Sequence, residues 1–111
     1  MTASDLSGTT CIVTGGGRGL GRAMVLALAG AGANVTAAMH IADDIESEAA
    51  GLPGKVKAMV ADIRDPMQCA EIISDTVATF GGIDTLVNNA GVGMLLVSES
   101  FNRTPPKFWD V

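Results

Sequence analysis

The 111-residue sequence has no tyrosine, one histidine and two cysteines. Without a tyrosine, the chain by itself excludes any mechanism that uses a phenol as general acid or base. His40, Cys11 and Cys69 match no metal-ligand or redox spacing, so we predict neither a metal site nor a thiol–imidazole nucleophile. Two buried, reduced thiols are the simpler interpretation, and they are typical of a cytoplasmic protein.

Basic residues are also scarce, because 7 Lys and Arg stand against 12 Asp and Glu, a formal net charge of -5. That balance lacks the basic face that binds nucleic acid or an anionic membrane, and we predict neither partner. The longest apolar stretch, 23–39, is interrupted by Gly30, Gly32 and Asn34. It predicts a helix followed by a strand rather than a membrane span. We expect no targeting segment in the short, polar stretch 1–8.

Short apolar runs alternate along the chain with helical patterns. Strands are predicted at 9–14, 35–39, 55–61 and 83–88, and helices at 20–31, 43–50 and 66–80, with a further helix beginning near 105. Asp65 and Pro66 are a strong helix start, and Gly81 with Gly82 ends that helix. The alternation predicts an α/β fold with a Rossmann-type, doubly wound parallel sheet of about four strands with flanking helices. We treat residues 1–111 as one dinucleotide-binding domain that is incomplete at its C-terminus.

Two of the predicted helices carry apolar stripes, the pattern of a face that packs on a sheet. In the first helix the stripe is Leu20, Met24, Ala27, Leu28 and Ala31. In the third helix it is Met67, Ala70, Ile73, Val77 and Phe80.

The most informative segment is the glycine-rich run 14–21, between the first strand and the first helix. Glycines there allow a tight turn and a close approach of the backbone to a pyrophosphate, and the helix N-terminus favours the negative charge. A purely structural turn is the alternative. The run is not a Walker loop, because no Gly-Lys-Ser/Thr follows it.

The spacing Thr14-Gly15-x-x-x-Gly19-x-Gly21 resembles the cofactor loop of the short-chain dehydrogenase/reductase family. Two more motifs stand in the order that this family has. Asp62, with Ile63 beside it, matches the acid that meets the adenine amino group. Asn88-Asn89-Ala90-Gly91 matches the signature that stabilises the sheet and borders the adenine ribose. The resemblance covers essentially the whole chain.

The resemblance implies an NAD(P)-dependent oxidoreductase that transfers hydride between the nicotinamide and a carbonyl or alcohol carbon of a small molecule. It also implies a homo-oligomer at full length. The cofactor-binding residues that it implies are Thr14, Gly15, Gly17, Arg18, Gly19, Leu20, Gly21, His40, Asp62, Ile63, Asn89, Ala90 and Gly91. Two plainer interpretations stay open: Asp62 as a solvated carboxylate at a strand end, and Asn88 with Asn89 as residues that satisfy backbone groups in a turn.

The end of the second strand bears on the choice between NAD and NADP. An acid there would bond the ribose 2′-hydroxyl. This sequence has Met39 followed by His40, so the acid is missing unless Asp43 or Asp44 folds back into that place. Arg18 stands where the family often has a base for the 2′-phosphate, and an exposed loop cation is the alternative. We predict NADP as the preferred cofactor, with NAD as the alternative.

The catalytic residues of the resembled family have no counterpart in this chain. Its Tyr-x-x-x-Lys pair cannot be placed, since Lys107 has Arg103 four residues before it. Ser98 and Ser100 follow Gly91 too closely to match the family's serine. We therefore expect the cofactor-binding half of a reductase. The alternatives are a short chain completed by a partner, or a non-catalytic module that binds the dinucleotide.

Overall fold

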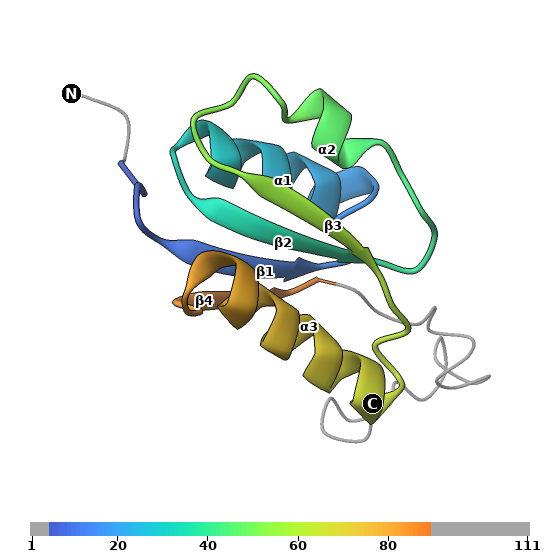
Figure 1. The fold of residues 1–111 in the computed structure, drawn as a ribbon. Helices are drawn as coiled ribbons and strands as arrows, with labels where there is room; N and C mark the ends of the chain where they lie inside the picture. The colour runs from blue at the N-terminus through green and yellow to red at the C-terminus, as the bar shows by residue number, and fades with distance from the viewer. Residues whose placement is uncertain (1–4, 90–111) are drawn as a thin grey trace, which may run out of the picture.

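The computed structural model describes residues 5–89, which form one parallel sheet with helices on both faces (Figure 1). The elements in chain order are β1 (Thr10–Thr14), α1 (Gly19–Gly30), β2 (Asn34–Met39), α2 (Ile45–Glu48), β3 (Val56–Val60), α3 (Pro66–Phe80) and β4 (Thr85–Asn88). The strand order is β3-β2-β1-β4, and every pairing is parallel. The predicted Rossmann-type α/β fold is confirmed for this part of the chain.

The two central strands are buried on both sides of the sheet. β1 pairs with β2 through Cys11 opposite Val35, and with β4 through Ile12 opposite Leu86. Every residue of β1 is buried, and so is every residue of β2 except its first. A short apolar run without alternation predicts this double burial.

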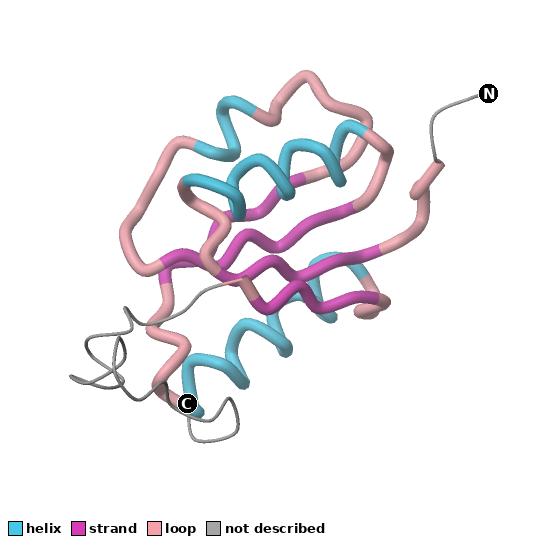
Figure 2. Tube along the Cα trace, turned by 180° about the vertical axis from the view of Figure 1, so that it is seen from behind, coloured by secondary structure: helices cyan, strands magenta, loops and turns pink. Residues whose placement is uncertain are grey.

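The helices lie in two layers, as Figures 1 and 2 show from opposite sides. α1 and α2 cover one face, where the core residues are Cys11, Val13, Val25, Ala29, Ala33, Val35, Ala37, Met39 and Ile45. α3 covers the other face, where the smaller core consists of Ile12, Ala38, Ala61 and Ile72. Side chains of successive strand residues point to opposite faces, which is why neighbours such as Ile12 and Val13 belong to different cores.

The bounds of α3 follow the predicted signals. The Asp65 side chain accepts a hydrogen bond of 2.9 Å from the Met67 N–H, and Pro66 is the first helical residue. Gly81, in the left-handed region at φ +92°, ends the helix. α2 is shorter than the predicted 43–50, and the strands begin or end within two residues of their predicted bounds.

Neither predicted stripe is the fully buried face of its helix, although Leu28 of the first stripe packs against the larger core. In α1 the buried residues are Gly21, Val25 and Ala29, whereas the side chain of Leu20 is 70% exposed. In α3 the buried residues are Ile72 and Thr76, while Met67, Ile73 and Val77 are exposed. The polar Thr76 can be buried because its hydroxyl is hydrogen-bonded to that of Thr36 on β2 and to the Ile72 carbonyl.

Three sequence predictions fall outside the described residues: Ala90, Gly91 and the helix near 105. Within residues 5–89, no helix has the length and apolar character that crossing a bilayer requires.

Candidate functional site

The loop between β1 and α1 requires glycine at several positions, for reasons of backbone conformation or of space. Gly15 and Gly19 have φ of +68° and +57°, in the left-handed region that favours glycine. A Cβ on Gly21 would overlap the Gly15 carbonyl and would lie 2.6 Å from the Asn89 amide nitrogen. A Cβ on Gly19 would have nothing within 4 Å, so the loop is tightly packed at Gly21 and open at Gly19.

The first turn of α1 leaves its amide groups available. Arg18 occupies the N-cap position in an extended conformation, and its side chain makes no capping hydrogen bond. The first N–H groups of a helix lack partners within the helix, and with the helix dipole they attract an anion. The loop and this helix end together have the chemistry of a phosphate site.

Thr14 and Asn89 join the loop to the carboxyl end of β4. The Asn89 N–H donates to Thr14 Oγ1 at 3.0 Å, and the Asn89 side-chain amide donates to the Gly15 carbonyl at 3.4 Å. Thr14 Oγ1 also lies 3.3 Å from Asn88 Oδ1. Both asparagines thus satisfy polar groups near the loop, in agreement with the plainer interpretation that the sequence left open.

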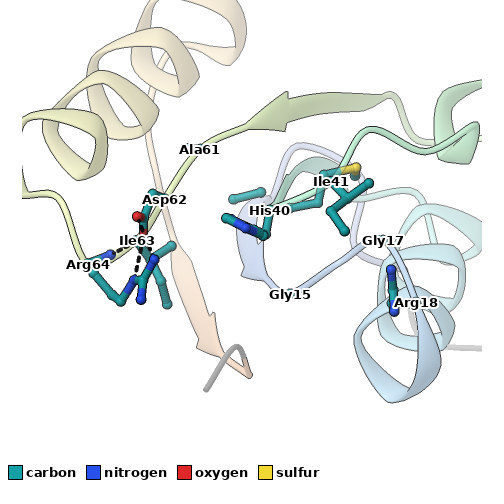
Figure 3. A pocket seen from close by; sticks show the side chains of 11 residues that line it. Gly15, Gly17, Arg18, His40, Ile41, Ala61, Asp62, Ile63 and Arg64 are labelled. Carbon is teal, nitrogen blue, oxygen red and sulfur yellow. Dashed lines mark hydrogen bonds and ion pairs between the residues drawn. The ribbon is translucent and has the colours of Figure 1, made fainter. Parts of the chain in front are cut away.

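A pocket of about 520 Å³ opens at the carboxyl ends of the strands (Figure 3). It is lined by Gly15, Gly17, Arg18, Ala38, Met39, His40, Ile41, Ala61, Asp62, Ile63 and Arg64. The volume is in the range of small-molecule sites, and the position is where ligands bind in open α/β sheets. Among the site residues predicted from the sequence and described here, the pocket brings together Gly15, Gly17, Arg18, His40, Asp62 and Ile63. Thr14, Gly19, Leu20, Gly21 and Asn89 do not line it.

Asp62 and Arg64 form a bidentate ion pair at one end of the pocket (Figure 3). Arg64 Nε lies 3.0 Å from Asp62 Oδ1, and Nη2 lies 3.0 Å from Oδ2. The Arg64 side chain, with help from its backbone N–H, lowers the pKa of Asp62 to about 2. This carboxylate is therefore ionised at neutral pH, and its two hydrogen bonds with the Arg64 guanidinium fix its orientation. The sequence prediction missed Arg64, although a base two residues after the acid was a visible signal.

The loop that carries Asp62 is held from α3. The Asp62 N–H donates to Gln68 Oε1 at 2.7 Å, and Cys69 Sγ donates to the Ile63 carbonyl at 3.1 Å. These two contacts fix the backbone at the positions that the sequence assigned to the base of a nucleotide.

The opposite end of the pocket has a basic residue and lacks an acid. Arg18 lines this end and makes no ion pair with any residue of 5–89, while His40 lies between it and Asp62 (Figure 3). Asp43 and Asp44 line no part of the pocket and instead form ion pairs with Arg22. Neither acid takes the place at the end of β2 that Met39 occupies.

The profile of the short chain dehydrogenase family matches residues 9–110. The chain is 41% identical over 90 residues to the 3-oxoacyl-[acyl-carrier-protein] reductase of Thermotoga maritima, covering 78% of this chain and 37% of the relative. It is also 41% identical over 103 residues to the 2,5-dichloro-2,5-cyclohexadiene-1,4-diol dehydrogenase of Sphingobium indicum, covering 90% and 41%.

Solved structures agree with the sequence matches. A variant of a Serratia marcescens short-chain dehydrogenase/reductase superposes with a TM-score of 0.77 at 38% identity, over 85% of this chain and 40% of that one. A hydroxysteroid dehydrogenase from Escherichia coli superposes with a TM-score of 0.75 at 32% identity, over 79% and 39%. The chain belongs to the short-chain dehydrogenase family, as the three motifs indicated. It spans about two fifths of the length of these relatives.

Family membership implies a nicotinamide dinucleotide as cofactor. The residues present fit such a group, because Gly15 and Gly17 of the loop line a pocket that continues to Asp62, and Gly19 has open space beside it at the start of α1. An extended ligand with a central pyrophosphate matches that shape.

Proposed function

We propose that this chain forms the cofactor-binding part of an NAD(P)-dependent oxidoreductase that prefers NADP(H). The observation that carries the proposal is the continuous pocket from Arg18 to Asp62, built over a glycine-rich loop and the uncapped start of α1. When bound, the nicotinamide exchanges hydride with a carbonyl or alcohol carbon of a small-molecule substrate. The full protein is a homo-oligomer of the cytoplasm in this proposal.

Each part of the pocket has a role in holding the dinucleotide. The backbone of Gly15, Gly17, Gly19 and Gly21 and the first turn of α1 receive the pyrophosphate, since close approach requires bare backbone there. Thr14 and Leu20 flank this loop and shape it. Asp62 accepts a hydrogen bond from the adenine amino group, and Ile63 packs beside the ring. Asn89, Ala90 and Gly91 border the adenine ribose.

The preference for NADP(H) is supported by the charges at the end of β2. A 2′-phosphate adds two negative charges at neutral pH, which a guanidinium binds through charge-assisted hydrogen bonds. Arg18 has no competing carboxylate partner in the described part of the chain, and Met39 and His40 stand where an acid would repel the phosphate. His40 lies in the same part of the pocket, where its ring can donate to the phosphate.

A non-catalytic dinucleotide-binding module is the second candidate, and the observation that favours it is the absence of tyrosine from all 111 residues. The two candidates make the same binding prediction and differ in turnover. An assay of NADPH oxidation with a panel of ketones separates them when it is run on the 111-residue chain and on a longer product that carries a Tyr-x-x-x-Lys segment.

Calorimetric titration of the chain with NADPH and NADH tests the proposal directly. We expect both to bind and NADPH to bind more tightly. Equal or tighter binding of NADH would overturn the NADP preference, and no binding of either would overturn the assignment of the site.

A further inference from the structure

Residues 40–48, which follow β2, include four acids. Glu46 accepts a hydrogen bond from the Ala58 N–H, and the other three, Asp43, Asp44 and Glu48, are paired with Arg22. β2 ends at Met39, which lines the pocket, so these carboxylates follow the strand that forms its wall. Left free, carboxylates there would repel a 2′-phosphate and would accept a hydrogen bond from a 2′-hydroxyl. Their placement therefore bears directly on which dinucleotide the chain selects.

One guanidinium pairs with Asp43, Asp44 and Glu48. Arg22, in the second turn of α1, forms ion pairs with Asp43, with Glu48 and, at 3.3 Å between Nη2 and Oδ1, with Asp44. The side chains of Arg22 and Asp43 are 22% and 32% exposed, so this pair is partly shielded from solvent, whereas Asp44 is 79% exposed. The hydrogen bond to Arg22 also lowers the pKa of Asp43, which keeps that carboxyl ionised.

Arg22 also contacts the cofactor loop. Its Nη1 donates to the Gly17 carbonyl at 3.3 Å, on the loop that lines the pocket. A Cβ built on Gly17 would lie 3.2 Å from Met39 Cβ and 3.6 Å from Asp43 Cβ. Asp43 is thus adjacent to Gly17, which lines the pocket together with Met39, and its ion pair directs its carboxylate to Arg22.

We infer that Arg22 is a specificity-determining residue for the cofactor: by holding the Asp43 carboxylate against α1, it keeps an acid out of the ribose end of the pocket. The inference rests on the proposed function. Arg22 touches no part of the cofactor in this account and acts through Asp43, so it is a positioning residue. Without it, Asp43 is free to turn toward the pocket and to take the role of the acid missing at position 39.

The test compares dissociation constants for NADPH and NADH in Arg22→Gln and in the double variant Arg22→Gln/Asp43→Asn. In Arg22→Gln we expect the ratio of the NADPH constant to the NADH constant to rise on the order of tenfold, as one charge placed near a phosphate would produce. In the double variant the ratio should return toward that of the unmodified chain. Lys57→Gln is the matched control, because it breaks the ion pair with Asp75 away from the pocket and should leave the ratio unchanged.

Two outcomes would overturn the inference. Equal weakening of both cofactors in Arg22→Gln would mean that Arg22 only supports the loop. A shifted ratio that persists in the double variant would mean that Asp43 is not the source. If Arg22→Gln fails to fold by circular dichroism, Arg22→Met replaces it, because methionine keeps much of the aliphatic stem and has no charge with which to hold Asp43. The ratio should then shift in the same direction, and an unchanged ratio overturns the inference.

The unmodified chain separates this inference from the proposed function. Its own ratio tests the NADP preference, whereas the change of that ratio on substitution tests the role of Arg22. A chain that favours NADH would contradict the former and leave the expected shift intact. A chain that binds neither cofactor would contradict both.

Discussion

The hydroxyls of Thr36 and Thr76 lie 2.7 Å apart in the buried contact between β2 and α3. Both side chains are fully buried. Thr76 Oγ1 also lies 2.7 Å from the Ile72 carbonyl, which can only accept, so Thr76 donates to Ile72. In the hydrogen bond between the two threonines, the Thr36 hydroxyl must therefore be the donor and Thr76 Oγ1 the acceptor.

Because Thr36 donates and Thr76 accepts, we expect unequal losses of stability when each hydroxyl is removed. Thr76→Val leaves the Thr36 donor buried without an acceptor, which should lower the free energy of unfolding by about 1–3 kcal/mol. Thr36→Val leaves Thr76 still bonded to Ile72 and should cost clearly less. Urea unfolding of the two variants measures the difference, and the double variant should be no less stable than Thr76→Val alone. Equal costs for the two single variants would show that the donor assignment is wrong.

Local patterns were sufficient to predict the order of the elements and the glycine-rich loop. β1 is a short apolar run between glycines, and the bounds of α3 depend on Asp65, Pro66 and Gly81, which act on their own neighbours. A tight turn before a helix requires glycine at particular positions, so the loop was also visible in the sequence.

Contacts between distant residues could not be predicted in the same way. The burial of Thr76 depends on Thr36, 40 residues earlier, and hydropathy favours the apolar residues that the structure leaves exposed on α3. The ion pairs of Arg22 with Asp43 and Asp44 depend on how α1 lies beside the segment after β2. The sequence alone therefore could not predict whether Asp43 and Asp44 face the pocket or pair with Arg22.

Gly21→Ala should disrupt the site and the fold together. The added Cβ would meet the Gly15 carbonyl and the Asn89 amide, which belong to the backbone and hydrogen bonds of the loop. We expect a lower melting temperature and no detectable binding of NADPH. Gly30→Ala is the matched control at the other end of α1, where a Cβ would have nothing within 4 Å. That variant should keep its binding and gain about 0.4–1 kcal/mol through the smaller entropy of its unfolded chain. Unchanged NADPH binding in Gly21→Ala would place the pyrophosphate elsewhere.

Arg18→Ala should weaken NADPH far more than NADH. The lost charge-assisted hydrogen bonds correspond to about 1.5–3 kcal/mol, or roughly tenfold to a hundredfold in the NADPH dissociation constant. Lys55→Ala removes an exposed cation that lies outside the pocket lining, and it should change neither constant. Calorimetry on both variants checks the prediction. A similar loss for both cofactors would assign Arg18 to the pyrophosphate instead of the 2′-phosphate.

Arg64→Gln should return the pKa of Asp62 from about 2 toward its ordinary value of 3.8, because the Arg64 side chain is the main cause of the shift. A carboxyl whose pKa is lower in the folded state favours folding above its unfolded pKa, and that contribution is lost as the pH falls through the folded value. The ion pair should therefore support stability fully above about pH 4 and lose its effect toward pH 2.

NMR titration of the side-chain carboxyls measures the pKa directly. The Asp5 carboxyl, whose pKa is lowered by Ser7, is the internal control and should titrate alike in both proteins. An Asp62 pKa that stays near 2 in Arg64→Gln would show that the backbone N–H of residue 64, not the guanidinium, holds this carboxylate in its ionised form.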